Sequence, residues 1–282
     1  MAEIISGTEM RAAILDELRQ EVEAIREKHG TVPGLVTILV GENPASISYV
    51  TLKVKTALSL GFHEIQDNQP ADVSEEALLA LIDKYNRDPS IHGILVQLPL
   101  PKHIDENKVI YAIDPDKDVD GMTPGSLAGL LTGQSGFAPC TAQACLELLD
   151  YYGVDPVGRR AVVIGRSLVV GQPAALLLQR RNATVTVCHT GTRDIPALCR
   201  EADIVIAAAG RPGLITADFL RPGQTVLDVG VHPGPDGTLC GDVAPEAAGL
   251  DLALTPVPGG VGSVTSAVLC KHTIQAAENT RL

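Results

Sequence analysis

Short segments made almost entirely of apolar residues constrain the second half of this chain more than any other feature. Residues 161–164, 204–208 and 226–229 are such segments, and glycines and polar residues separate them. Strands that are apolar on both faces are typical of a parallel sheet covered by helices on both sides. A helix expected over 171–180 and a strand expected over 184–188 complete the alternation. We therefore predict an α/β unit with a mostly parallel sheet.

The first half of the chain shows the same alternation of helix and strand. Apolar residues from Ile14 to Ile25 recur at helical spacing, and Gly30 ends that run. A strand over 35–40, a helix from Pro44 to about Gly61, a helix over 74–85 and a strand over 93–97 are expected next. The sequence thus predicts two α/β domains, and a helix over 142–152 could link them.

Charge and cysteine usage exclude several classes of function. The net charge of −12, without a basic stripe, argues against nucleic acid, because a phosphate backbone would repel the chain. No apolar run reaches the ~20 residues that cross a bilayer, and the N-terminus lacks a secretory pattern, so we expect no membrane partner. The six cysteines form no CxxC pair, which favours free thiols in a reducing cytoplasm and gives no support for a metal site.

Residues 165–173 predict a turn that binds a dinucleotide. Gly165 ends a predicted strand and Gly171 begins a predicted helix, so that backbone N–H groups would face a pyrophosphate at the helix N-terminus. Ser167 stands where the second glycine of G-x-G-x-x-G would be. An ordinary strand-to-helix turn is the alternative, and the strand–turn–helix–strand order favours the cofactor.

The strand after this turn indicates which cofactor is bound. It ends at Cys188 with no Asp or Glu, which would hold the ribose hydroxyls of NAD and repel a 2′-phosphate. Arg166, Ser167, His189 and Thr190 can instead donate hydrogen bonds to a phosphate. We therefore expect NADP rather than NAD. Arg193 is a further candidate, with a solvated surface arginine as the alternative.

A tyrosine and a lysine four residues apart predict a site in the first half of the chain. On a helix, Tyr49 and Lys53 share one face, which places an aromatic plane beside an amine that can move protons. Gln97 ends a predicted buried strand, where the sheets of α/β proteins bind ligands, and its amide can orient a water or polarise a carbonyl. A solvated lysine and a loop-capping glutamine are the alternatives.

The aspartate-rich run 114–121 invites comparison with a calcium-binding loop. Asp116, Asp118, Asp120 and Gly121 match the first half of an EF-hand loop, but Leu127 stands where the bidentate Glu is required, so calcium is rejected. We expect Asp120 instead to bind an N–H-rich heterocycle. The chain contains no G-x-S-x-G and no H-E-x-x-H motif, which leaves serine or metal hydrolysis without support.

Five runs together resemble one family, the bifunctional methylenetetrahydrofolate dehydrogenase/methenyltetrahydrofolate cyclohydrolases. They cover residues 41–53, 93–101, 116–121, 165–173 and 256–265, and the similarity extends over essentially the whole chain. The resemblance implies oxidation of 5,10-methylenetetrahydrofolate with NADP and hydrolysis of the methenyl product to 10-formyltetrahydrofolate, in one-carbon metabolism that serves purine and amino-acid biosynthesis.

The resemblance also implies an architecture and partners. A catalytic, folate-binding domain would comprise residues 1–139 plus 264–282, and a Rossmann-like NADP-binding domain residues 140–263. The protein would be a homodimer that takes tetrahydrofolate derivatives as substrates, with the folate bound between the domains.

The resemblance further implies a set of site residues. Lys53 would move the proton in the hydrolysis, Gln97 would orient it, Tyr49 would border the pterin and Asp120 would anchor it. The expected substrate-binding residues also include Leu98, Pro99, Pro258, Gly259, Gly260, Val261 and Gly262. The expected cofactor-binding residues are Gly165, Arg166, Ser167, Gly171, His189, Thr190 and Val231.

Three runs depart from the family's usual residues. They are Gly262-Ser263-Val264-Thr265, Pro139-Cys140-Thr141-Ala142 and Ser126-Leu127-Ala128. They bear on the relative rates of the two activities rather than on the reaction class. The alternatives are a dehydrogenase with weak or no cyclohydrolase activity and a non-catalytic NADP-sensing protein. A hydroxy-acid dehydrogenase would need a His–carboxylate pair and a substrate-binding Arg, which we do not find.

Overall fold

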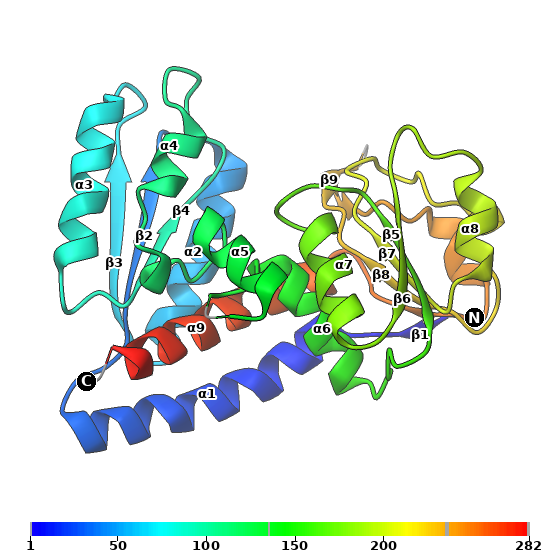
Figure 1. Cartoon of the computed structure of the whole chain (residues 1–282), viewed down its shortest axis with the longest axis horizontal. Coiled ribbons are helices and arrows are strands. Elements are labelled where there is room, and N and C mark those ends of the chain that lie inside the picture. The colour runs from blue at the N-terminus through cyan, green and yellow to red at the C-terminus, as the bar shows by residue number, and fades with distance from the viewer. Residues whose placement is uncertain (1, 135, 235–236, 281–282) are drawn as a thin grey trace. The chain divides into compact units, whose positions relative to one another are not determined.

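The chain folds into two compact units, each built around a parallel sheet (Figure 1). The computed structural model describes residues 2–134, 136–234 and 237–280. The first unit comprises Met1–Ala12 and Thr141–Thr265, and the second comprises Ala13–Cys140 and Ser266–Leu282. The predicted α/β class with a mostly parallel sheet is confirmed.

The first unit holds a six-stranded sheet in which all neighbouring strands run parallel. In sheet order the strands are β1 (Glu3–Ile4), β11 (Ala253–Leu254), β8 (Thr225–Asp228), β7 (Ile204–Ala207), β5 (Arg160–Ile164) and β6 (Thr184–Cys188). Helices α6 (Cys140–Tyr151), α7 (Gly171–Arg180) and α8 (Ile195–Glu201) accompany it, and β9 (His232–Pro233) pairs with β10 (Leu239–Cys240) in a separate ribbon. Its short 3₁₀ helices are η2 (Ala217–Phe219) and η3 (Pro245–Gly249).

The first twelve residues group with this sheet rather than with the rest of the N-terminal half. Glu3 and Ile4 of β1 pair with Ala253 and Leu254 of β11, so that β1 forms one edge of the sheet. The expected boundary assigned these residues to the other domain. Two-residue strands carry no detectable periodicity, which is why the sequence did not indicate this pairing.

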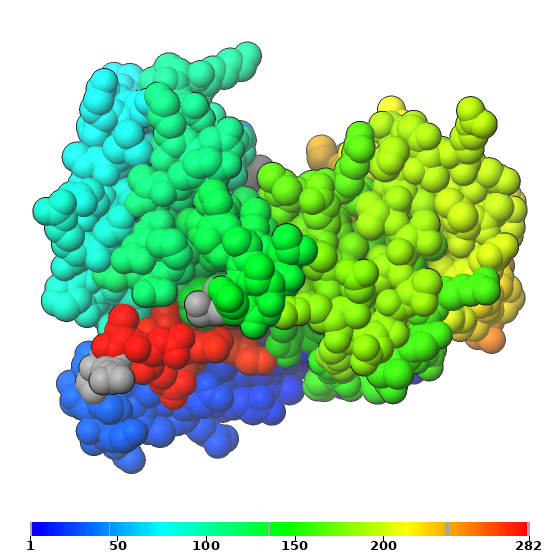
Figure 2. All heavy atoms as spheres, in the orientation of Figure 1, coloured from blue at the N-terminus to red at the C-terminus, as the bar shows by residue number. Residues whose placement is uncertain are grey.

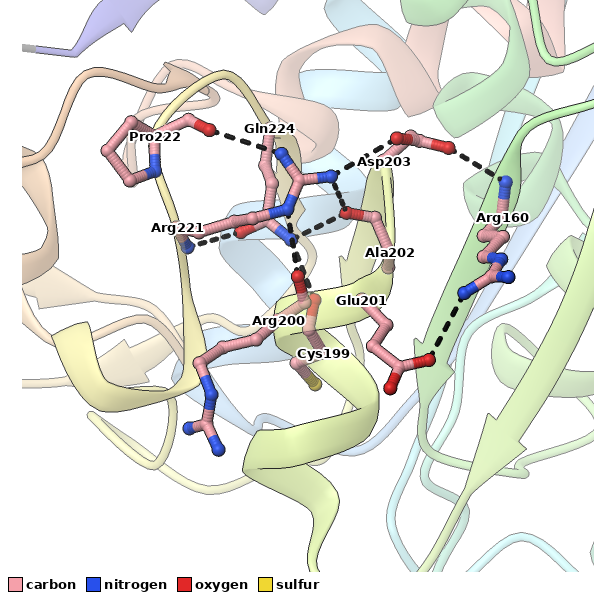
Figure 3. Close-up of polar contacts among 9 residues, drawn as sticks. All are labelled: Arg160, Cys199, Arg200, Glu201, Ala202, Asp203, Arg221, Pro222 and Gln224. Atoms are coloured by element: carbon pink, nitrogen blue, oxygen red, sulfur yellow. Dashed lines mark hydrogen bonds and ion pairs between the residues drawn. The ribbon is translucent and has the colours of Figure 1, made fainter.

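A polar network joins the amino ends of the strands in this unit (Figure 3). The buried Gln224 side chain donates from Nε2 to the carbonyl oxygens of Cys199 and Ala202 at 2.7 and 2.8 Å. Arg221 donates from Nη2 to Oδ1 of Asp203 at 3.2 Å. The carboxylate of Asp203 also accepts the backbone N–H of Arg160, at the start of β5, at 3.0 Å. These contacts fix the amino edge of the sheet and leave the carboxyl edge for the loops described below.

The second unit is a three-stranded parallel sheet with helices on both faces. Its strands are β3 (His63–Gln69), β2 (Gly34–Val40) and β4 (Gly93–Val96), in that order. Its helical elements are α1 (Gly7–His29), which begins in the first unit, α2 (Pro44–Ser59), α3 (Glu75–Arg87), α4 (Glu106–Tyr111), η1 (Pro115–Lys117), α5 (Pro124–Thr132) and α9 (Val261–Asn279), whose first turn also belongs to the first unit.

The central strand β2 is buried on both faces. Val36 and Ile38 pack with Ile82 of α3 in one apolar cluster, whereas Leu39 packs with Val50 of α2 in another. Helices α1 and α9 run side by side along this unit (blue and red in Figures 1 and 2). Among the described residues, no helix is long and apolar enough to cross a membrane.

Two buried polar atoms lie on one face of this sheet without a hydrogen-bond partner among the described residues. They are Oγ1 of Thr37 on β2 and Oε1 of Glu64 on β3. Burial raises the pKa of the Glu64 carboxyl. The protonated form therefore suits the folded state better than the ionised form does.

We expect Glu64→Gln to make the protein less sensitive to alkaline pH. Because the folded-state pKa of Glu64 is raised, its contribution to stability is complete below the unfolded pKa and is lost as pH rises through the folded pKa. The variant, which cannot ionise, should match the wild type near pH 4 and exceed its unfolding temperature near pH 8. Urea or thermal unfolding across this range tests it, with exposed Glu17→Gln as control; parallel curves for wild type and Glu64→Gln would contradict it.

Candidate active site

Lys53 and Gln97 meet at the carboxyl edge of the three-stranded sheet. Strand β4 ends at Val96, and the backbone N–H of Gln97 still donates to the carbonyl of Ile38 at 2.9 Å, which fixes the residue at the strand end. Lys53 lies on α2, the helix that follows β2, and its Nζ donates to Oε1 of Gln97 at 3.3 Å. The other end of the Gln97 amide donates to the Leu98 carbonyl at 2.7 Å. The two predicted residues therefore form a hydrogen-bonded pair.

Tyr49 lies one helical turn before Lys53 on α2. Its side chain is 45 % exposed, whereas Lys53 is half-buried. The i, i+4 spacing places the two side chains on one face of the helix, as the sequence predicts. The ring is thus available to a flat ligand beside the amine.

Leu98 and Pro99 follow Gln97 directly. Their peptide bond is cis, Leu98 is half-buried and Pro99 is exposed. The next residue, Leu100, is buried in the apolar cluster between β2 and α3. The segment therefore leaves the strand end with Pro99 on the surface and Leu100 anchored in the core.

A tight turn holds Asp120. Its neighbour Gly121 has φ +71°, and a Cβ there would lie 2.5 Å from the backbone of Ala138. The buried Asp118 carboxylate accepts the N–H groups of Met122 and Thr123 at 3.0 and 2.6 Å, which fixes the far side of the turn. Of the aspartates in this run, Asp118 thus has a structural role and Asp120 is left to face other groups.

The surroundings of Asp120 include Lys53 and a buried thiol. Burial raises the pKa of the Asp120 carboxyl, while the nearby Lys53 offsets part of the rise and Asp118 adds to it. Burial also raises the pKa of the Cys140 thiol well above its usual range, and Asp120 adds to the effect. Cys140 Sγ donates to the Val119 carbonyl at 3.2 Å. An amine, an amide and a carboxylate with an altered pKa therefore gather in one unit, which is suited to binding an N–H-rich ring and moving a proton.

Five further predicted substrate residues, 258–262, lie in a loop of the first unit and in the first turn of the helix that follows it. The Val257–Pro258 bond is cis, Gly259 has φ +101°, and its carbonyl accepts the N–H of Thr8 at 3.1 Å. A Cβ on Gly260 would lie 2.4 Å from the Pro256 carbonyl oxygen. Val261 is buried at the start of α9, and Gly262 is exposed in its first turn. The backbone of this loop therefore requires glycine at 259, for its positive φ, and at 260, for lack of space, whereas Gly262 has open space around it.

The predicted cofactor turn lies at the carboxyl end of β5 and needs both of its glycines. Gly165 has φ +125°, and a Cβ there would lie 2.0 Å from the Ala208 carbonyl oxygen, in the loop after β7. A Cβ on Gly171, the first residue of α7, would lie 2.2 Å from the Gly165 carbonyl oxygen. The turn is therefore a tight backbone cradle at a helix N-terminus, the feature that suits a dinucleotide phosphate.

Ser167 holds the start of α7. Its Oγ accepts the N–H groups of Val170 and Gly171 at 3.2 and 3.4 Å. Arg166 is exposed, and its carbonyl accepts Nε2 of Gln172 at 3.1 Å. The Arg166 side chain therefore projects from a backbone that is fixed on both sides.

His189 and Thr190 follow the neighbouring strand β6. Nδ1 of His189 accepts the N–H of Gly191 at 3.1 Å, so the ring proton of the neutral form lies on Nε2, which can donate. The His189 N–H donates to Oγ1 of Thr192 at 2.9 Å, and Thr190 is exposed. Gly165 N donates to the Cys188 carbonyl at 2.9 Å, so this loop and the glycine turn are neighbours.

Beyond β8, the structure reveals two buried aspartates that sequence reasoning missed. Val231, a predicted cofactor residue, is 38 % exposed in this loop. Asp228 at the end of β8 and Asp242 are both buried, and burial raises the pKa of Asp228 to about 6 although it accepts three backbone N–H groups. In the sequence these two aspartates appear only in two separate Asp-Val pairs, which indicate no site. Among the described residues, no group of three metal-binding side chains occurs.

Comparison with known families gives two matches that cover almost the whole chain. Residues 5–120 match the model described as tetrahydrofolate dehydrogenase/cyclohydrolase, catalytic domain. Residues 139–281 match the model described as tetrahydrofolate dehydrogenase/cyclohydrolase, NAD(P)-binding domain.

Individual relatives agree with this match. The chain is 53 % identical to the bifunctional protein FolD of Desulfosudis oleivorans, over 98 % of this chain and 97 % of the relative. The crystal structure of the bifunctional FolD enzyme of Campylobacter jejuni superposes with a TM-score of 0.96 at 40 % identity, and both chains are covered completely (100 %). The Trypanosoma brucei FolD structure, which was solved with NADP and an inhibitor, gives a TM-score of 0.94 at 40 % identity over 100 % of this chain and 99 % of that one.

We expect Gly121→Ala to lower the free energy of unfolding by about 3 kcal/mol, because its Cβ would meet backbone atoms that cannot move aside. Gly30→Ala is the matched control: it lies in the same unit with φ +68° and nothing within 4 Å, so positive φ alone should cost about 1 kcal/mol. Urea unfolding of both variants tests the difference. Equal losses would mean that the Asp120 turn can relax.

Proposed function

Because the chain belongs to the tetrahydrofolate dehydrogenase/cyclohydrolase family, we propose that it carries out both reactions on one-carbon folates. It oxidises 5,10-methylenetetrahydrofolate to the methenyl cation with NADP, and it adds water to that cation to give 10-formyltetrahydrofolate and a proton. The observation that carries the proposal is the Lys53–Gln97 hydrogen bond with Asp120 nearby.

The roles of the side chains follow from their chemistry. In the first reaction the methylene carbon loses a hydride, and its neighbouring nitrogens stabilise the cation, so the protein mainly orients the substrate. Asp120 accepts hydrogen bonds from the amino group and ring N–H of the pterin, and Tyr49 borders the ring. Leu98 and Pro99 line the same strand end, and residues 258–262 are proposed as further substrate-binding residues.

The second reaction requires proton transfer as water attacks the methenyl carbon. Lys53 is the group that moves the proton, and Gln97 orients it through the bond from Nζ to Oε1. The three departures from the family's usual residues lie away from these two side chains in sequence. Both activities are therefore expected.

The glycine turn of the first unit fits a dinucleotide phosphate, since a Cβ at Gly165 or Gly171 would fill the cradle. NADP, when bound, accepts the hydride. Arg166, Ser167, His189 and Thr190 would supply donors for its 2′-phosphate, and Val231 would be a further cofactor-binding residue. The unit containing Thr141–Thr265 is thus proposed to bind NADP and the unit containing Ala13–Cys140 to bind folate.

We further propose a cytoplasmic homodimer that serves purine and amino-acid biosynthesis. All six cysteines are free thiols, and five of them are buried, which suits a reducing compartment. The dimer rests on the family resemblance, and sedimentation of the purified protein tests it.

Lys53→Met should abolish the cyclohydrolase activity, because the methionine keeps the apolar stem but cannot carry a proton. We expect a fall of about 10²–10⁴-fold in the hydrolysis of methenyltetrahydrofolate, followed by its absorbance. Lys55→Met, an exposed lysine on the same helix, is the matched control and should hydrolyse at the native rate. Hydrolysis at the native rate by Lys53→Met would refute the proposed role.

Arg166→Ala should weaken NADP more than NAD, because only NADP carries the 2′-phosphate. Loss of a charge-assisted hydrogen bond predicts a rise of about tenfold or more in the KM for NADP, with little change for NAD. The control is Arg180→Ala, an exposed arginine at the far end of α7. Equal losses for both cofactors would show that Arg166 does not read the 2′-phosphate.

A further inference from the structure

Asp242 is a buried carboxylate whose acceptor sites are all in use. Its Oδ2 accepts the backbone N–H groups of Ala209 and Gly210 at 2.6 and 2.9 Å. Its Oδ1 accepts the N–H of Arg211 at 2.8 Å and bonds Nε2 of His232 at 2.8 Å. Because a carboxylate only accepts, the imidazole donates from Nε2, and the four bonds fill the four acceptor positions.

Asp228 adds a second set of bonds at the same place. Its Oδ1 accepts the N–H groups of Gly230 and Asp242 at 3.0 and 2.9 Å, and its Oδ2 accepts that of Val243 at 2.9 Å. A Cβ on Gly230 would lie 2.4 Å from Asp242 Oδ1. The two carboxylates therefore join the loops after β7 and β8 to the segment around residue 242. The packing there leaves no space for a side chain at position 230.

These loops lie beside the proposed cofactor turn. Strands β7 and β8 are parallel neighbours of β5, so the three carboxyl ends share one edge of the sheet. The loop after β7 touches the turn, because the Ala208 carbonyl oxygen lies 2.0 Å from where a Cβ of Gly165 would be. What fixes the loop after β7 therefore also fixes one wall of the turn.

Among the described residues, His232 is the only side chain that bonds to either carboxylate. The other partners of the two carboxylates are backbone N–H groups. His232 follows Val231 directly, and it is the first residue of β9, paired with Cys240 of β10. The His232 side chain is 19 % exposed, and the Asp242 side chain is fully buried. A bond between these side chains thus sets the distance between the Val231 segment and residues 209–211.

We propose that His232 is a positioning residue for the nicotinamide cofactor, acting through its bond to Asp242. The bond holds the Val231 segment and the 209–211 loop in one arrangement before the cofactor binds. Cofactor binding therefore does not lose conformational entropy by ordering these two segments. The proposal rests on the proposed dehydrogenase function and deepens it. It assigns no chemical step to the imidazole.

The test is a comparison of cofactor and folate kinetics in His232→Ala. We expect the KM for NADP to rise by about tenfold, the loss of one hydrogen bond to a buried charge. The KM for methylenetetrahydrofolate and the rate of methenyltetrahydrofolate hydrolysis, which needs no NADP, should stay at wild-type values. His232→Asn, whose amide can still donate to Asp242, should recover part of the NADP affinity.

A control variant separates this role from general damage to the β9–β10 ribbon. Leu239→Ala removes an exposed side chain of β10, 45 % exposed, and should leave the KM for NADP unchanged. Titration of each variant with NADP alone, at a temperature below its unfolding temperature, measures the affinity for NADP in the absence of catalysis.

Two results would overturn the inference. One is an unchanged KM for NADP in His232→Ala, and the other is an equal rise in His232→Ala and Leu239→Ala. Wild-type protein that hydrolyses methenyltetrahydrofolate but neither binds nor reduces NADP would refute the proposed dehydrogenase function, and this inference with it.

Discussion

Parallel pairing of β5, β7 and β8 brings three strand ends to one edge of the sheet, and the proposed cofactor site depends on that alignment. Opposite this edge, Gln224 and Asp203 join the amino ends of the strands and fix their relative register. At the carboxyl edge the backbone must then pass very close to itself, which is why Gly165 has no room for a side chain beside Ala208. The backbone conformation of these loops is therefore determined by the positions of the strand ends rather than by the intrinsic conformational preferences of the loop residues.

The same constraint acts in the smaller sheet, with a different result. Helix α2, which carries Lys53, follows strand β2, and Gln97 directly follows strand β4. Because β2 and β4 are neighbouring strands, the side chains of Lys53 and Gln97 meet. Asp120 is positioned differently, by a turn that Asp118 and Gly121 hold in place. Burial raises the pKa of Asp120, and the nearby Lys53 opposes part of that rise.

Much of this arrangement could be predicted from the sequence, because buried parallel strands are apolar on both faces. Helix α7 and strand β6 have the predicted bounds, and the Lys53–Gln97 pair is found where the motifs indicate. Strand β3 was not predicted, since its residues His63–Gln69 are mostly polar and show no apolar alternation. It is held by backbone pairing with β2 along all seven residues. Asp228 and Asp242 were missed for a related reason: their partners are mainly backbone N–H groups from distant loops, which leave no pattern in the side chains.

Ser167 shows how the turn works without the second glycine of the usual fingerprint. Its Oγ accepts the N–H groups of Val170 and Gly171, at the start of a helix whose N-cap residue provides no side-chain bond. The serine therefore stabilises α7, but it also occupies two donors that a pyrophosphate would otherwise use. More of the binding energy for a cofactor anion must then come from charged side chains near the turn, and Arg166, within the turn itself, is an exposed cation. The 2′-phosphate that distinguishes NADP from NAD offers an exposed cation such as Arg166 an additional charge-assisted hydrogen bond. This is the physical reason to expect NADP rather than NAD at this edge of the sheet.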